Sequence, residues 1–224
     1  TAYRGEIVAR ALSMGMFMVV FTALWSTAFA GRGLTALAGY TREQVLWYLV
    51  MTETIVLATS RVFLEISESV KAGDIAYTLI RPMHYAAWQV AHSLGNSLPK
   101  FLTNLVAGSV VVFAFTGNVA GSAQGLLSFA LLGTFALFLD AIIAVLLGLS
   151  AFWLEDVSPV FWIYQKLLFT IGGMLLPLEF FPDWLQRVSA WLPFQLIAYA
   201  PARAFVDFHP SFFFRAVAGQ MAYL

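Results

Sequence analysis

The side chains most able to do chemistry are few and scattered along this chain of 224 residues. His84, His92 and His209 stand far apart, without an HExxH motif or the Cys/His spacing of a metal site. The chain has no cysteine, which excludes disulfides, thiolate metal sites and a cysteine nucleophile. No lysine follows a glycine-rich phosphate-binding loop. We therefore expect no catalytic residue, metal or cofactor on this chain, and any ATP hydrolysis must come from another polypeptide.

Three charged residues stand out because they lie inside long apolar segments. Glu53, Asp140 and Lys166 each fall near the middle of such a segment. A charge at the centre of a bilayer costs at least about 2.5–3.5 kcal/mol on insertion scales, which makes these residues candidates for a function. One lysine can closely neutralise only one carboxylate. The other carboxyl group should then be hydrated, hydrogen-bonded or protonated.

The composition of the chain is that of a membrane protein. Hydrophobic residues make up 61% and charged residues 11%, and the mean hydropathy is +0.82. Soluble domains carry about 25% charged residues. Acidic and basic residues number 12 each, a balance that indicates no nucleic acid partner. We expect an all-α integral membrane protein, because no segment alternates as the strands of an outer-membrane barrel do.

Apolar runs long enough to cross the hydrocarbon core define the spans. A core of about 30 Å takes roughly 20 helical residues. Pro99 and Lys100 obscure the start of the third run. We predict a single transmembrane domain over residues 1–224, with spans at about residues 12–30, 44–64, 98–116, 125–153, 159–178 and 215–224, the last cut at its end.

The connection between the second and third spans, residues 65–83, has the pattern of a short amphipathic helix. Ile66 and Val70 fall on one helical face, with Ser67 and Glu68 on another. Gly73 then permits a turn, and the Arg-Pro pair at residues 81–82 ends the segment.

A second short helix is predicted after the fifth span, between Pro182 and Pro193. An apolar stripe lies opposite Gln186 and Arg187, and two of its members are tryptophans, which suit a membrane interface. The stripe consists of Trp184, Leu185, Val188, Trp191 and Leu192.

Residues 65–82, EISESVKAGDIAYTLIRP, resemble the cytosolic loop of the type-2 ABC exporter permeases, in the bacterial branch with a GDIA...L.RP signature between its second and third spans. The order and spacing of further elements extend this resemblance over nearly the whole chain. These elements are Tyr40-Thr41, residues 48–53, Leu176-Pro177, Phe181-Pro182-Asp183-Trp184, Leu192-Pro193-Phe194 and Pro201.

The resemblance implies a six-span ABC exporter permease fold in the bacterial cytoplasmic (inner) membrane. An N-terminal elbow helix would occupy residues 1–10, and short re-entrant external helices would follow the fifth span at residues 179–205. Both termini would be cytosolic. Two permeases, as a homo- or heterodimer in the lipid bilayer, would dock on separate ABC ATPase subunits, which would hold the ATP and Mg.

The resemblance also implies two functional surfaces. An ATPase-coupling loop over residues 65–83 would present Glu65, Glu68, Lys71, Gly73, Asp74, Arg81 and Pro82. An external cap would include Pro177, Phe181, Pro182, Trp184, Pro193 and Phe194.

The intramembrane charges can be paired with the help of the same resemblance. It places the second and fifth spans near the permease dimer interface, so we expect Glu53 to pair with Lys166; a structural polar contact without a role in transport is an equal alternative. For Arg61, four residues before Glu65, we expect a local ion pair or a side chain that reaches the membrane surface.

The expected function is therefore that of a permease subunit without its own ATP site. It would move an amphiphilic or large substrate outward by alternating access driven by the ATPases. The alternative is an ion- or proton-coupled secondary transporter in which Glu53, Asp140 and Lys166 form a relay. The distribution of Lys and Arg among the connections is too even to fix the orientation.

Overall fold

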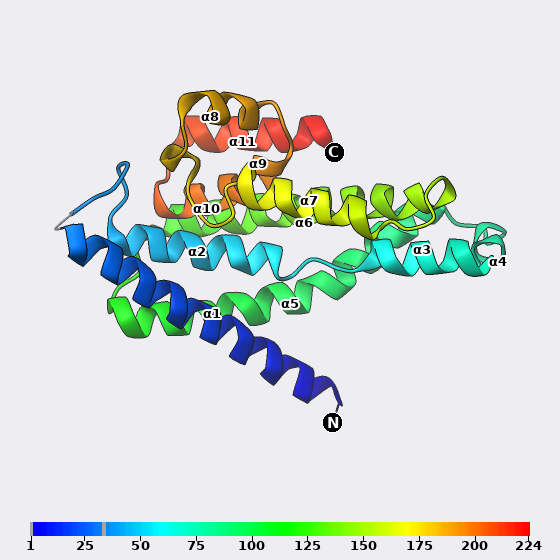
Figure 1. Ribbon diagram of the computed structural model, residues 1–224, viewed down its shortest axis with the longest axis horizontal. Coiled ribbons are helices and arrows are strands. Elements are labelled where there is room, and N and C mark those ends of the chain that lie inside the picture. Colours follow the sequence, from blue (N-terminus) through cyan, green and yellow to red (C-terminus); the bar gives the residue numbers. More distant parts are fainter. Residues whose placement is uncertain (1, 33–34) are drawn as a thin grey trace.

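The computed structural model describes residues 2–32 and 35–224, which are mostly helical (Figure 1). In this part of the chain, β-structure is limited to an isolated bridge between Leu37 and Tyr40. The α-helices are α1 (Ala2–Arg32), α2 (Arg42–Val56), α3 (Val62–Ala72), α4 (Ile75–Leu79), α5 (Tyr85–Thr116), α6 (Ala123–Leu149), α7 (Ser158–Thr170), α8 (Asp183–Ala190), α9 (Phe194–Ile197), α10 (Tyr199–Val206) and α11 (Pro210–Tyr223); the 3-10 helices are η1 (Ser150–Phe152) and η2 (Leu178–Phe180).

Three helices in the described residues are long and apolar enough to cross a membrane. They extend over Gly5–Gly31, Tyr85–Thr116 and Ala123–Phe152. α4 lies at one end of the molecule, next to α3, which packs against α6; we call this the α4 end (Figure 1). α8, α9 and α10 lie toward the opposite end, which we call the cap end.

The helix α2 lies at the centre of this arrangement. Every residue from Val45 to Ile55 is buried, and α2 packs against α1, α5, α6 and α10. Its start is fixed by Thr41, whose hydroxyl accepts from the Gln44 N–H while the Gln44 side chain accepts from the Thr41 N–H. The core of the bundle therefore surrounds a helix too short to cross a bilayer alone.

The elbow helix predicted at residues 1–10 is not a separate element over the described residues 2–10. α1 runs from Ala2 to Arg32 without interruption, and Thr1 lies outside the described residues. The physical reason is local, because Glu6 and Arg10 form an ion pair of 3.2 Å at the i,i+4 spacing that favours a continuous helix. Two of the predicted elements are thus one helix.

The predicted second span at residues 44–64 is broken. α2 ends at Val56 and α3 begins at Val62. The Thr59 hydroxyl donates to the Val56 carbonyl at 3.0 Å, a local bond that competes with helix continuation.

The predicted fifth span at residues 159–178 also stops early. α7 ends at Thr170, before Gly172 and a Gly173 that has φ +69°. A positive φ is readily adopted by glycine and cannot continue a right-handed helix.

The third span begins earlier than predicted. α5 starts at Tyr85, where the His84 side chain accepts from the Ala87 N–H at 3.3 Å. Pro99 is accommodated inside this helix, so the sequence interruption there does not mark its beginning.

The contact between α6 and α10 depends on a glycine. A Cβ atom on Gly125 would lie 2.4 Å from the Phe205 carbonyl oxygen, which is a backbone atom and cannot rotate away. We expect Gly125→Ala to lower the melting temperature in detergent by several degrees, because a clash of this kind costs about 1–3 kcal/mol. In the matched control Gly15→Ala, the new Cβ would meet nothing closer than 3.6 Å, and equal stability of the two variants would contradict the packing.

Candidate functional site

A polar cavity opens at the junction between α2 and α3. It has a volume of about 730 Å³ and lies among α1, the residues 56–61, α3, α5 and the start of α7. We call this cavity the vestibule. Its charged lining residues are Glu6, Arg10, Arg61, Glu65 and Lys100.

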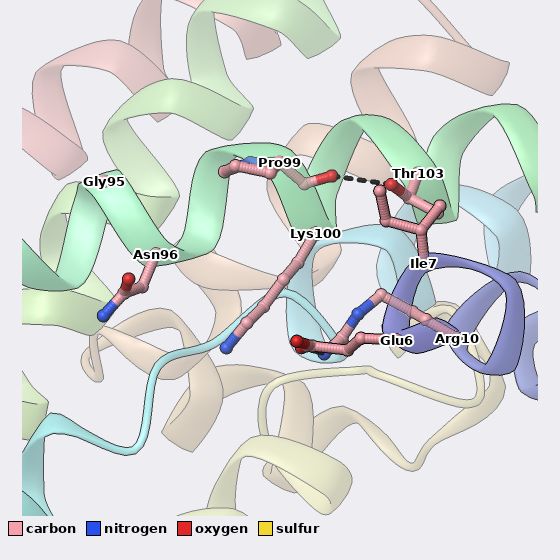
Figure 2. Close-up of a pocket in the computed structure, with 8 residues that line it drawn as sticks. All are labelled: Glu6, Ile7, Arg10, Gly95, Asn96, Pro99, Lys100 and Thr103. Carbon is pink, nitrogen blue, oxygen red and sulfur yellow. Dashed lines mark hydrogen bonds and ion pairs between the residues drawn. The ribbon is translucent and has the colours of Figure 1, made fainter. Parts of the chain in front are cut away.

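A smaller groove between α1 and α5 adjoins the vestibule. It has a volume of about 230 Å³ and shares Glu6, Arg10, Asn96 and Lys100 with it. Figure 2 shows the Lys100 side chain extending from α5 beside Glu6 and Arg10 of α1. Charges that are 90 residues apart in the sequence are therefore brought to one place by the packing of α1 along α5.

The helix break at residues 57–61 forms one wall of the vestibule. Where a helix stops, its last carbonyl groups lose their partners within the helix. Arg10 donates from Nη1 to the Leu57 carbonyl at 3.2 Å. The side chain that pairs with Glu6 therefore also ties α1 to the end of α2.

Two cations of the vestibule have no acidic partner among the described residues. Arg61 and Lys100 form no ion pair there, whereas Arg10 pairs with Glu6. Of the two alternatives predicted for Arg61, the ion pair with Glu65 is wrong, because the Glu65 carboxylate faces His92 of α5 at 3.3 Å. The other alternative, a side chain that reaches the membrane surface, stays a prediction. Arg61 is left exposed beside the cavity.

The predicted ion pair between Glu53 and Lys166 is also wrong. The Glu53 side chain is 1% exposed, and neither carboxylate oxygen has a hydrogen-bond partner in the described structure. Lys166 is exposed, with its ammonium 5.7 Å from the centre of the Phe169 ring. The cause is helical phase: α7 turns Tyr164 and Leu168 inward, so that Lys166 faces outward.

Asp140 has a partner that sequence reasoning did not identify. The Tyr164 hydroxyl of α7 donates to its Oδ1 atom at 2.5 Å, and both side chains are buried. Both residues, with Lys166, line a pocket of about 210 Å³ that we call the inner pocket. The signal in the sequence was a tyrosine in the segment that also carries Lys166, but pairing it with Asp140 required the packing of α6 against α7.

The predicted ATPase-coupling loop lies at the α4 end and is almost entirely accessible. α3 buries Val62, Phe63, Ile66 and Ser67; the predicted placement of Ser67 on the polar face is therefore wrong. Gly73, at φ +78°, makes the turn into α4. The seven residues singled out from the sequence are all exposed: Glu65, Glu68, Lys71, Gly73, Asp74, Arg81 and Pro82.

The predicted external cap contains the expected helix between Pro182 and Pro193, which is α8. Its apolar stripe is open, since Trp184 is 63% and Trp191 84% exposed. Of the other cap residues, Pro177 is buried, Pro182 is exposed, and Phe181, Pro193 and Phe194 are half-buried.

A polar cluster that the sequence did not reveal holds the cap together. The Tyr199 hydroxyl donates to Glu179 at 2.5 Å, and Arg203 donates to the Tyr199 oxygen at 2.6 Å and pairs with Glu179 at 3.1 Å. Burial, and then the Glu179 charge, raise the pKa of the Tyr199 hydroxyl, which keeps it protonated as a donor. The Arg203 guanidinium also lies 4.5 Å from the centre of the Phe212 ring of α11.

The histidines have structural contacts. His84 caps α5, His92 faces Glu65, and His209 pairs with Asp207 at 3.1 Å. Within the described ranges, no group of three or more His, Cys, Asp or Glu side chains could hold a metal ion.

The fold and the vestibule define an α-helical integral membrane protein with a polar cavity between its helices. Within that class, residues 7–223 match the family described as ABC-2 family transporter protein. The chain belongs to this family of transporter permeases, and the resemblance found in the sequence is confirmed. No curated protein and no solved structure matches the chain. The family is the membrane subunit of an ABC transporter rather than its ATP-binding domain, and it implies an ATPase partner.

The bond between Tyr164 and Asp140 can be tested by removing its donor. We expect Tyr164→Phe to lower the free energy of unfolding by about 1–3 kcal/mol, because a buried carboxyl group loses its partner. Unfolding in detergent measures this, with Tyr77→Phe as the control because Tyr77 is 73% exposed. In a double-mutant cycle with Asp140→Asn, strictly additive effects would show that the two side chains do not interact.

Proposed function

We propose that this chain is the permease subunit of an ABC exporter. It moves an amphiphilic or large substrate outward by alternating access, and separate ATPase subunits supply the energy. The observation that carries the proposal is the apolar tip of the molecule at the α4 end. Tyr77, Leu79 and Ile80 are 73%, 54% and 80% exposed, although they lie on the segment farthest from the apolar bundle (Figure 1).

An exposed apolar tip with a polar surround is the form of a docking surface. Large exposed apolar patches mark protein or membrane contacts, and a short helix that fits a groove on a partner is a common recognition mode. Lys71, Asp74 and Arg81 are exposed around the tip and suit a water-filled groove better than lipid. This arrangement supports the ATPase as the partner, and under this proposal the α4 end lies in the cytosol.

The packing of α3 supports a lever that carries force into the bundle. A Cβ atom on Gly148 of α6 would lie 2.9 Å from the Ile66 Cβ atom. The two helices are therefore in close contact at Gly148, and a displacement of α3 would displace α6 as well. Movement of α4 would thus be passed to α6, which carries Asp140, and to the vestibule that α3 lines. The cap at the opposite end, re-entrant from the external side, would be the exit, and a second permease copy or homologue would complete the pathway.

The alternative of an ion- or proton-coupled transporter has less support. A relay needs Glu53, Asp140 and Lys166 in one connected network. Asp140 and Lys166 line the inner pocket, but Glu53 is not part of its lining and has no partner in the described structure.

Docking through the tip can be tested by co-purification. We expect the variant with Tyr77→Ser and Ile80→Ser to lose about tenfold or more of the ATPase that stays with the wild-type chain in detergent, because buried aromatic and aliphatic anchors dominate interface energy. The control is Trp184→Ser, an exposed aromatic at the cap end. Equal recovery of the ATPase with both variants would rule out docking at α4.

The turn at Gly73 offers a separate test of coupling. Gly73→Val places a β-branched residue at φ +78°, which costs about 1–2 kcal/mol and turns α4 away from its position. We expect ATP hydrolysis by the reconstituted complex to continue while export falls severalfold. Gly31→Val is the control, since a Cβ there meets nothing within 4 Å and no positive φ is involved. Unchanged export by a stably inserted Gly73→Val protein would count against the lever.

A further inference from the structure

The vestibule and the inner pocket adjoin each other. Both are lined by Val56, Leu57, Thr59, Phe161 and Gln165, so they lie side by side along the end of α2 and the start of α7. We call the two cavities together, with the groove between α1 and α5, the path; its lining reaches from Lys100 to Asp140.

The polarity of this path changes along its length. Its outer part carries three cations, Arg10, Arg61 and Lys100, and two carboxylates, Glu6 and Glu65. Glu6 pairs with Arg10 and Glu65 faces His92, so Arg61 and Lys100 have no acidic partner among the described residues. Its inner part has mainly apolar walls, which include Leu168, Phe169 and Met174. The cation that lines this part, Lys166, is an exposed residue of α7. The carboxylate of Asp140 at the inner end is already hydrogen-bonded by Tyr164. A ligand that fits has an anionic end and an apolar body.

The position of Arg10 along α1 matches the level of one surface of a bilayer. Arg10 lies roughly 20 residues before the end of the apolar span at Gly31, which is about 30 Å along a helix and equals the hydrocarbon thickness. An amphiphile in that leaflet holds its headgroup at this level and directs its tail toward the midplane. The cavity has the same order, with cations at the surface and apolar walls inside.

We propose that the vestibule and inner pocket are the loading site for an amphiphile with an anionic headgroup, taken from the leaflet at the α4 end. Arg61 and Lys100 bind the headgroup, and the inner pocket receives the apolar body. This assignment rests on the proposed export function for its direction, since it names the substrate class that would enter from the cytosolic leaflet. Binding itself requires no ATPase.

The test measures lipid selectivity of the purified chain in phosphatidylcholine nanodiscs. Spin-labelled phosphatidylglycerol and spin-labelled phosphatidylcholine are compared by electron spin resonance, which gives the ratio of their association constants. We expect Lys100→Gln and Arg61→Gln each to lower this ratio by about fivefold, because a basic residue near an anionic lipid surface contributes that much. Lys100→Arg should restore the ratio.

The control is Arg187→Gln, which removes an exposed cation of α8 at the cap end. If Lys100→Gln and Arg61→Gln retain the wild-type ratio in folded protein, or if Arg187→Gln lowers it equally, the cations only face lipid and the loading site is refuted. Displacement of the lipid probe by excess inorganic phosphate would show that the site recognises free phosphate, which overturns the assignment to an amphiphile.

Failure of the loading site and failure of the export function give different results. If no ATPase co-purifies but phosphatidylglycerol binding depends on Lys100, the export function fails and the anionic site stands. If the ATPase co-purifies through α4 but selectivity is insensitive to Lys100 and Arg61, the permease assignment stands and this substrate class is wrong.

Discussion

The structure depends on how the backbone groups are satisfied where two helices stop inside the bundle. A hydrocarbon medium offers these groups no water, so each must find a partner in the protein. At the end of α2, Arg10 donates to the Leu57 carbonyl. At the end of α7, the Tyr48 hydroxyl donates to the Gly173 carbonyl, and the Ser189 hydroxyl donates to that of Ile171 at 2.6 Å. The partners come from distant elements, so each break locks two parts of the chain together.

These two breaks shape the two ends of the molecule. The break after α2 forms one wall of the vestibule and separates α2 from α3, which packs on α6 toward the α4 end. The break after α7 turns the chain toward η2 and α8, and the Tyr199 N–H fastens the cap by donating to the Gly172 carbonyl at 3.1 Å. Glu179, Tyr199 and Arg203 then bind η2 to α10. The exposed α4 end and the cap end thus lie on opposite sides of the vestibule, as the proposed export function requires.

The position of a charged residue within an apolar segment does not reveal which partner its side chain has in the structure. Glu53, the most deeply buried carboxylate, has no partner in the described residues, while Lys166 on α7 faces outward. Arg61 and Lys100 lie near the ends of predicted spans, where cations are common, so their positions in the sequence do not mark them as functional. The packing of α1 along α5 brings Lys100 to the vestibule beside Arg10, and Arg61 lines the same cavity. Arg61 and Lys100 therefore say more about a ligand of the cavity than Glu53 and Lys166 do.

The sequence by itself determined the membrane class, the family and the exposed segment at residues 65–83, because hydrophobic runs, the GDIA...L.RP motif and a helical polar face are local properties. Helix ends were harder to predict: His84 and Gly173 act through local backbone geometry, yet whether a break is tolerated depends on a distant partner such as Tyr48. Only the tertiary structure decided that Asp140 bonds to Tyr164 and that Lys100 and Arg10 line the same cavity. Successive side chains of a helix point in directions about 100° apart, so the orientation of the helix about its axis decides which of them face the core and which face lipid. The packing of all the helices together fixes that orientation.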